Sequence, residues 1–301
     1  MNIKFTYELM NRLDFPADAK SYLGGVCETL TSDERFRGDI SKAEDLYFTE
    51  RTDDRVTEIL KSISDYLRIE VCTIHFCFLL LCTDRLRREY ALRGLDDALF
   101  WDLMLDLRCK LLECHNLCGL WGTLVFEWFH HHFLIELFAL GRFQYIKMPF
   151  PYEKYEYGDI CINRGDTVYN FHIPSSGPFP RDLRIDSYKR AFDFFGCKEK
   201  GYIPLICISW LLYPENAELF REGSNLLDFV RDFDIIGSEK TDAFYDSWRV
   251  FGKPCDTPVD ELPEDTSLMR SFKKRMAEGG SFGEGCGIII FDGKKIVNKT
   301  E

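Results

Sequence analysis

The feature that most constrains the fold of this 301-residue chain is a change of pattern near Gly141. Over residues 1 to about 140, apolar side chains recur at helical spacing, and Pro16 is the only proline before Pro149. After Gly141, short runs of β-forming residues alternate with amphipathic segments. The sequence therefore predicts an all-helical domain over residues 1–139, followed by a mixed-sheet domain of the α+β or α/β class over residues 140–301.

Within the first domain, two polar clusters predict helix starts. One is Thr31-Ser32-Asp33-Glu34, and the other is Thr52-Asp53-Asp54, which precedes apolar residues at helical spacing. The aromatic stretch 124–140 predicts a further helix. The apolar stretches 71–82 and 117–140 are respectively too short and too polar to span a membrane, so both are predicted to be core helices.

The second domain is predicted to alternate strands and helices. The predicted strands are 142–148, 168–173, 202–212 and 226–236, and the predicted helices are 182–195, 214–220 and 266–277. Residues 287–297 are predicted to form a last strand or a hairpin with Asp292-Gly293 as its turn.

The stretch 168–195 joins a predicted strand, a Ser/Gly/Pro turn and a predicted helix. Ser175, Ser176 and Gly177 can bring backbone N–H groups close to a ligand, and Asp182 can open the helix. A helix N-terminus carries about half a positive charge, which favours a phosphate. The stretch therefore predicts a phosphate-binding turn with a titratable group, His172, at its mouth.

Charge and cysteine content narrow the classes of function. The chain has 38 basic and 50 acidic residues, a net charge of −12, and no concentrated basic patch, which argues against nucleic-acid binding. It has 12 cysteines, and its N-terminus, MNIKFTYELMNRLDF, lacks an apolar signal region. We therefore expect free, mostly buried thiols in the reducing cytoplasm and no association with a membrane.

A series of motifs in the second domain carries a resemblance to a known family. In order they read LGRFQYI (140–146), VYNFHIPSSGPF (168–179), CISWLLYPE (207–215), SNLLDFVRDFDI (224–235), WRVFGKP (248–254) and LPEDTSLMRSFKKRMAEGG (262–280). The chain resembles the bacterial acyltransferase domain-containing family, in which a helical N-acyltransferase N-terminal domain precedes a GNAT-like C-terminal domain. The likeness is specific over residues 140–290 and rests on helical character over residues 1–139.

The resemblance implies an N-acyltransferase with acetyl-CoA or another acyl-CoA as co-substrate and a small-molecule amine as acceptor. Ser175, Ser176 and Gly177 are then candidate contacts for the CoA pyrophosphate, and Arg181 and Arg184 are candidate partners for outer phosphates. The alternative is a tight Pro/Ser/Gly loop that binds no ligand.

Two features depart from the family pattern. The turn usually reads Q/R-x-x-G-x-G/A, whereas here it contains Pro174, Pro178 and Pro180, each of which removes one N–H donor. The third strand often reads C-H-S-W-L, and here Ile208 occupies the histidine position. These departures favour the rival function, a non-catalytic GNAT-like module that binds a ligand or interacts with a protein.

Acyl transfer to an amine needs a base, donors for the oxyanion and an acid for the leaving thiolate. His172 is the predicted base, or alternatively a structural imidazole that fixes the turn. The resemblance makes Tyr213 the predicted acid, unless it packs as an ordinary aromatic residue at a strand end. Ser209 and Asn225 are candidate acceptor contacts, and Asn225 could instead cap a turn.

No metal is expected. His130, His131 and His132 are consecutive, and successive helical residues point about 100° apart, so the three rings cannot converge on one ion. The sequence predicts no particular oligomeric state.

Overall fold

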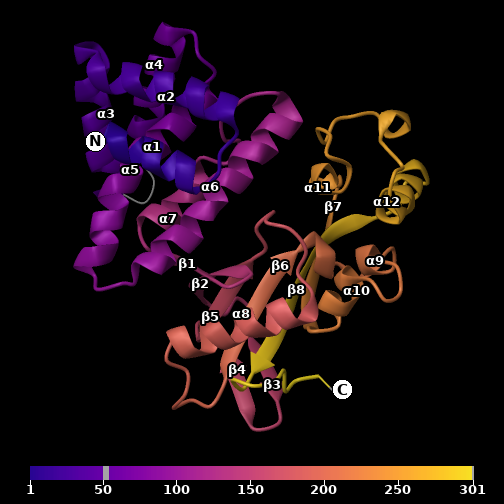
Figure 1. The fold of residues 1–301 in the computed structure, drawn as a ribbon. Coiled ribbons are helices and arrows are strands. Elements are labelled where there is room, and N and C mark those ends of the chain that lie inside the picture. The colour runs from indigo at the N-terminus through magenta and orange to yellow at the C-terminus, as the bar shows by residue number, and fades with distance from the viewer. Residues whose placement is uncertain (50–53, 300–301) are drawn as a thin grey trace. The chain divides into compact units, whose positions relative to one another are not determined.

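The computed structural model describes residues 1–49 and 54–299. Thr52 and Asp53, part of a predicted helix start, lie outside the described residues. The chain divides into two compact units, Met1–Phe138 and Ala139–Glu301, which we call the helical unit and the sheet unit (Figure 1).

The helical unit is organised around α5. This helix is apolar on every side over its first half, so residues 73–83 are all buried, and α1, α2, α4 and α6 contact it. The elements of the unit are α1 (Ile3–Arg12), α2 (Ala17–Ser32), α3 (Glu34–Thr49), α4 (Asp54–Leu67), α5 (Val71–Leu92), α6 (Asp97–Cys118), η1 (Glu127–Phe129) and α7 (His130–Phe133).

None of the described helices is by itself long and apolar enough to be a membrane span. Within the described part of the chain, one pair of helices, α4 and α5, meets the length and composition criteria when taken together, and the pair is bent by 120° at its break.

The sheet unit contains a six-stranded mixed sheet in the order β1-β2-β5-β6-β8-β7 and a separate β3-β4 hairpin. The β5–β6 pair is parallel, and the β2–β5, β6–β8 and β7–β8 pairs are antiparallel. The predicted fold class, an all-helical region followed by a mixed-sheet domain, is therefore confirmed. The strands are β1 (Leu137–Leu140), β2 (Phe143–Pro149), β3 (Lys154–Tyr157), β4 (Ile160–Asn163), β5 (Thr167–His172), β6 (Ile203–Ser209), β7 (Asp234–Thr241) and β8 (Phe282–Phe291). The helices are α8 (Arg181–Phe194), η2 (Trp210–Leu212), α9 (Pro214–Ala217), α10 (Asn225–Val230), α11 (Ser247–Phe251), η3 (Val259–Glu261) and α12 (Ser267–Ala277).

One face of the sheet is covered by α8, and we call it the α8 face. Phe171 of β5 lies 5.8 Å from the ring of Tyr188 on α8. The hydroxyl of Ser187, also on α8, donates to the Leu140 carbonyl at 2.6 Å. Gly141 turns the chain there with φ of 73°, and a Cβ on it would lie 3.3 Å from the Ser187 backbone, so a glycine suits this close approach.

The opposite face, which we call the second face, carries a separate apolar core. Val168 of β5 and Ile206 of β6 both belong to it. Because side chains alternate along a strand, Asn170, His172 and Ile208 lie on this second face as well.

The prediction of a helix over 124–140 is wrong, because only η1 and α7 are helical there and β1 follows them. Ile135 adopts a left-handed conformation with φ of 57°, and the Glu136 N–H donates to the His131 carbonyl at 3.1 Å. This local geometry ends the helix before β1.

The prediction of a strand over 226–236 is also wrong over its first half. Ser224 accepts a hydrogen bond from the Leu227 N–H at 3.2 Å and caps α10, so β7 begins only at Asp234. Phe229 of α10 and Phe233, which follows this helix, are both buried. The β3-β4 hairpin was not predicted.

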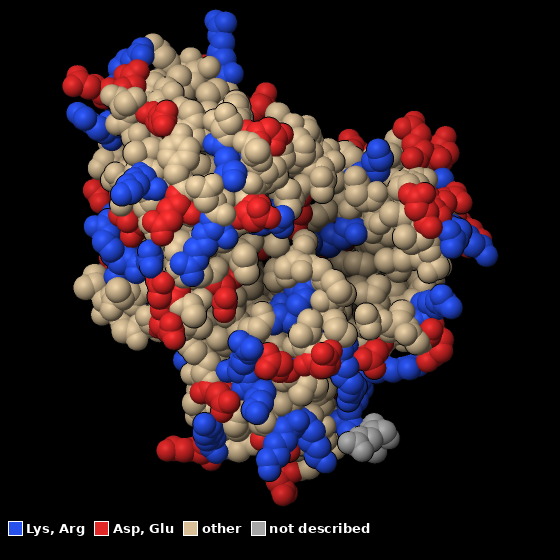
Figure 2. Space-filling model, viewed as in Figure 1, with Lys and Arg blue, Asp and Glu red and all other residues tan. Residues whose placement is uncertain are grey.

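Charged groups of both signs are interspersed on the molecular surface that Figure 2 shows. Many form exposed ion pairs, such as Lys61 with Asp65 at 2.8 Å and Arg190 with Asp186 at 2.7 Å. Pairs of this exposure contribute about 0–1 kcal/mol each.

Candidate functional site

The parallel strands β5 and β6 separate toward their carboxyl ends. Their pairing ends at Asn170 and Ile206, although β5 continues to His172 and β6 to Ser209. Ile208 is 46% exposed even though β6 is an interior strand of the sheet. The carboxyl ends of β5 and β6 therefore diverge. His172 and Ser209 lie at these two strand ends.

The turn after β5 is held by the guanidinium of Arg142. It donates to the carbonyl oxygens of Pro174 at 3.0 Å and Pro178 at 3.1 Å. In a trans peptide the C=O and the following N–H point in opposite directions, so the N–H groups of Ser175 and Phe179 point away from Arg142. These hydrogen bonds from Arg142, which we call the Arg142 clamp, therefore leave backbone N–H donors on the opposite side of the turn.

The three predicted pyrophosphate contacts lie together on this turn. Ser175, Ser176 and Gly177 are all exposed. Gly177 has φ of 109°, a conformation that favours glycine, and its carbonyl also accepts from Arg142. Their contact with a pyrophosphate stays a prediction.

Helix α8 begins directly after the turn, and no described side chain caps it. The N–H of Arg184 donates to the Pro180 carbonyl at 3.1 Å, as the first bond of the helix. The N–H groups of Arg181, Asp182 and Leu183 precede that bond and lie at exposed positions. Turn and helix start together form an arrangement suited to an anion.

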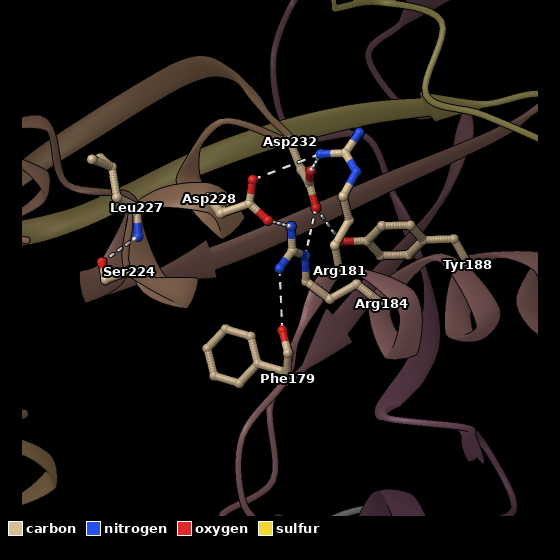
Figure 3. Close-up of polar contacts among 8 residues, drawn as sticks. All are labelled: Phe179, Arg181, Arg184, Tyr188, Ser224, Leu227, Asp228 and Asp232. Atoms are coloured by element: carbon tan, nitrogen blue, oxygen red, sulfur yellow. Dashed lines mark hydrogen bonds and ion pairs between the residues drawn. The ribbon is translucent and has the colours of Figure 1, made fainter. Parts of the chain in front are cut away.

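The side chain of Arg184 is buried and bonded within the protein, a placement that does not support its predicted contact with outer phosphates. Its Nε donates to Asp232 and its Nη2 to Asp228, both at 2.7 Å, while its Nη1 donates to the Phe179 carbonyl at 3.1 Å (Figure 3). The side chains of Arg184 and Asp232 are 0% and 1% exposed. Arg184 therefore fastens the start of α8 to the turn and to the α10 segment.

Burial raises the pKa of the Asp232 carboxyl, and the hydrogen bond from Arg184 offsets only part of that effect. Tyr188 also donates to Asp232, at 3.3 Å. The ionised form of the buried Asp232 carboxyl therefore depends on the hydrogen bonds that Arg184 and Tyr188 donate to it.

Arg181 lies on the surface beside this buried group. Its Nη1 is 3.5 Å from Asp232 and 3.8 Å from Asp228, and its side chain is 60% exposed (Figure 3). Its role as a phosphate partner stays a prediction, which its exposure and its place at the helix start support.

His172 is half-buried at the end of β5. Its Nε2 lies 3.2 Å from Nδ2 of Asn170, two residues earlier on the same face. With this assignment of the amide, Nδ2 donates, Nε2 accepts, and the ring proton is on Nδ1. Asn170 therefore orients the imidazole and, in this arrangement, occupies the lone pair of Nε2.

Tyr213 and Ser209 lie at either end of η2. A Cβ at Gly283 would be 2.8 Å from the Tyr213 ring, so the phenol packs directly over β8. Burial, followed by nearby Glu215, raises the pKa of Tyr213, so the phenol is protonated at neutral pH. Ser209 accepts from the Leu211 N–H at 3.2 Å and caps η2, and its predicted acceptor contact remains a prediction.

Asn225 is the exposed first residue of α10. The cap of that helix is its neighbour Ser224 and not Asn225. Its contact with an acceptor is not tested by this geometry.

His172 and Tyr213 lie over opposite faces of the sheet. Tyr213 packs on Gly283 of β8, and Gly287 lies on the same face of that strand. A Cβ on Gly287 would lie 2.6 Å from the Phe233 ring. Phe233 stacks on Phe171 at 5.9 Å, which identifies the α8 face. His172 points to the second face, so the two residues could act on one ligand only where β5 and β6 part.

The three consecutive histidines have three different environments. The His132 Nε2 is 3.2 Å from Asp106, and the His131 Nδ1 is 3.2 Å from Glu136. The ring of His130 stacks on the ring of Tyr47 in α3. Among the described residues, no group of three or more His, Cys, Asp or Glu side chains is placed to hold a metal ion.

Asp106 and His132 form a buried pair, with side chains 1% and 0% exposed. Oδ2 of Asp106 also accepts from the Trp128 indole at 3.1 Å. Burial alone would raise the pKa of Asp106, but the hydrogen bond from His132, with nearby Lys110 and Trp128, outweighs burial and holds the pKa below its usual value.

Sequence reasoning missed Arg142, Asn170 and Asp232. Asn170 could have been found from its spacing, since residues two apart on a strand share a face with the candidate base. Arg142 and Asp232 carried no local signal, because their partners lie more than 30 residues away along the chain.

Comparisons with known proteins describe the same architecture. The profile of the GNAT-like C-terminal domain matches residues 137–289, and that of the N-acyltransferase N-terminal domain matches residues 4–134. A search of curated proteins found no match.

Several solved structures share the fold. An acyltransferase in complex with decanoyl-CoA and teicoplanin has a TM-score of 0.75 and 22% identity, covering 94% of this chain and 87% of its own. An acyltransferase mutant in complex with octanoyl-CoA has a TM-score of 0.75 and 21% identity, covering 96% of this chain and 88% of its own. An acyltransferase in complex with CoA and 10C-teicoplanin has a TM-score of 0.74 and 22% identity, covering 93% and 86%. The protein thus has an acyltransferase fold, and it belongs to the family that joins an N-acyltransferase N-terminal domain to a GNAT-like C-terminal domain.

Proposed function

We propose that this protein is an acyl-CoA-dependent N-acyltransferase that acts on a small-molecule amine. The observation that supports this most strongly is the junction of the splayed β5–β6 pair with the clamped turn and the uncapped start of α8. Outward backbone N–H groups and a helix N-terminus suit a pyrophosphate. Related structures that contain octanoyl- or decanoyl-CoA make a medium-chain acyl donor as good a candidate as acetyl-CoA.

In the proposed reaction the amine nitrogen attacks the thioester carbon, a C–N bond forms and the C–S bond breaks. Nε2 of His172 accepts the amine proton once the amine replaces Nδ2 of Asn170 at that nitrogen, and the Tyr213 hydroxyl donates a proton to the departing thiolate. A thioester held where the strands part would have His172 on one side and Tyr213 on the other, which matches their placement on opposite faces.

The second candidate is a non-catalytic module that binds an acyl-CoA. Its support is Ile208, an apolar and exposed side chain at the position where the family often has a histidine. Incubation with acetyl- or decanoyl-CoA and a panel of primary amines, including teicoplanin, separates the two candidates. We expect free CoA, resolved by chromatography, to rise with enzyme and amine; stable acyl-CoA in the presence of a bound complex would favour the module instead.

We expect His172→Ala to lower kcat by about 10²–10⁴-fold, because a positioned base contributes on that scale. CoA affinity should change little, because the turn is clamped by Arg142 and not by His172. Steady-state kinetics and titration with CoA measure the two effects separately. An equal loss of both would assign His172 to the structure of the turn.

We expect Arg142→Ala to weaken CoA binding by about tenfold, equivalent to roughly 1.4 kcal/mol, because the turn loses its clamp. Arg190→Ala is the matched control, since Arg190 belongs to the same unit and pairs with exposed Asp186. Isothermal titration of both variants with CoA is the measurement. Equal affinities for the two variants would show that the turn does not hold the pyrophosphate.

A further inference from the structure

The helical unit contains two pairs of neighbouring thiols, Cys72 with Cys114 and Cys27 with Cys77. All four are free cysteines. The pairs differ in exposure and in what surrounds each sulfur, and this difference predicts different reactivity.

Cys72 and Cys114 are brought together by the segment after α6. Cys72 is the second residue of α5, and its carbonyl accepts from the Thr123 N–H at 3.1 Å. A Cβ at Gly122 would lie 2.7 Å from the carbonyl carbon of Cys72, while the Gly122 N–H donates to the Cys114 sulfur. Both cysteines therefore contact the same glycine, and their thiols hydrogen-bond to each other.

The surroundings of Cys72 stabilise a thiolate. The hydrogen bond from Cys114 is the largest effect, and with the hydroxyl and N–H of Thr73 it lowers the pKa of Cys72 to about 7 against the opposing effect of burial. The start of α5 adds a favourable dipole. Cys72 is only half-buried, so a small reagent can reach it.

The other pair lacks these features. Cys27 and Cys77 are both 0% exposed. Each thiol donates to a backbone carbonyl at 3.8 Å, Cys27 to Cys77 and Cys77 to Leu23. Burial raises the pKa of Cys77 well above its usual value. The Cys27–Cys77 pair therefore serves as an internal control, because it also has two neighbouring thiols but neither is exposed to a reagent in solution.

We propose that Cys72 and Cys114 form a peroxide-reactive dithiol, in which Cys72 is the nucleophile and Cys114 resolves it into an intramolecular disulfide. The Cys72 thiolate attacks one oxygen of hydrogen peroxide, the O–O bond breaks, and sulfenic acid and hydroxide form. The Cys114 sulfur then attacks the Cys72 sulfur, the S–O bond breaks, and one water leaves as its thiol proton is transferred. Two thiols are oxidised and one peroxide is reduced. This modification site lies wholly within the helical unit and does not depend on the proposed acyl transfer.

The test uses the full chain with the exposed thiols removed by Cys118→Ser, Cys161→Ser and Cys255→Ser. After stoichiometric hydrogen peroxide, quenching and alkylation in denaturant, we expect mass spectrometry to show a peptide linked through Cys72 and Cys114 and the loss of two thiols per chain. Adding Cys114→Ser should leave a sulfenic acid on Cys72 that dimedone traps. Adding Cys72→Ser should abolish both products.

A second measurement needs no further variant. In the same protein, iodoacetamide should alkylate Cys72 at least about tenfold faster than Cys27 or Cys77 at pH 7, with a rate that rises with pH through about 7, because the thiolate is the reactive form. No linked Cys72–Cys114 peptide, or equal reaction of the Cys27–Cys77 pair, would overturn the proposal.

Discussion

Replacing Arg184 by methionine should destabilise the sheet unit by about 3–5 kcal/mol, the usual cost of removing one partner of a buried ion pair. Methionine keeps much of the side-chain length but removes the donors to Asp232, Asp228 and the Phe179 carbonyl. Asp232 would then remain buried with Tyr188 as a donor. Urea unfolding followed by circular dichroism, with hydrogen exchange of the α8 amides to localise the change, is the measurement.

Arg190→Met on the same helix is the control, because Arg190 and Asp186 form an exposed pair with side chains 57% and 49% exposed. Its effect should stay within about 1 kcal/mol. The destabilisation by Arg184→Met should be smaller at pH 5 than at pH 8. Burial already raises the pKa of Asp232, and without Arg184 the folded state favours the protonated carboxyl still more, so its stability falls as pH rises. Equal losses for the two variants would show that the Arg184 cluster does not hold α8.

Asp106→Asn should destabilise the helical unit by about 3 kcal/mol, because it removes the buried carboxylate that accepts from His132 and Trp128. Oδ2 of Asp106 also accepts from Trp128, so local order of the α7 segment should fall with global stability. Hydrogen exchange of residues 126–134 and urea unfolding measure the two effects. Asp65→Asn, at an exposed pair with Lys61, should cost less than about 1 kcal/mol.

The pH dependence of this pair has a definite sign. The pKa of Asp106 in the folded state lies below the ordinary value of 3.8, so its contribution is present above that value and is lost as pH falls through the folded pKa. Wild-type protein should therefore lose more stability than Asp106→Asn on acidification below about pH 4. Parallel curves for the two proteins would contradict the buried pair.

The strand–turn–helix at the site was predictable because its signals are local. Alternating β-formers predicted β5, and the amphipathic run after the prolines predicted α8, within one or two residues of their observed bounds. The divergence of β5 and β6 was not predictable from local signals, since nothing within either strand says where their pairing ends.

The distinct roles of Arg181 and Arg184 could not be predicted from the sequence. They are three residues apart on one helix and share the same chemistry, yet one is 60% exposed and the other is fully buried. Asp232 decides this difference, and it lies 48 residues beyond Arg184. The helix predicted over 124–140 failed for a similar reason, because the left-handed backbone of Ile135 carries no residue signal.

Isothermal titration of the folded wild-type chain with CoA and with decanoyl-CoA tests the central claim most directly. The account predicts saturable binding of one ligand per chain by both, with competition between them, because the turn and the start of α8 are proposed to hold the part that the two ligands share. The absence of binding heat at several temperatures, with a folded protein verified by circular dichroism and with no thermal stabilisation by either ligand, would contradict it.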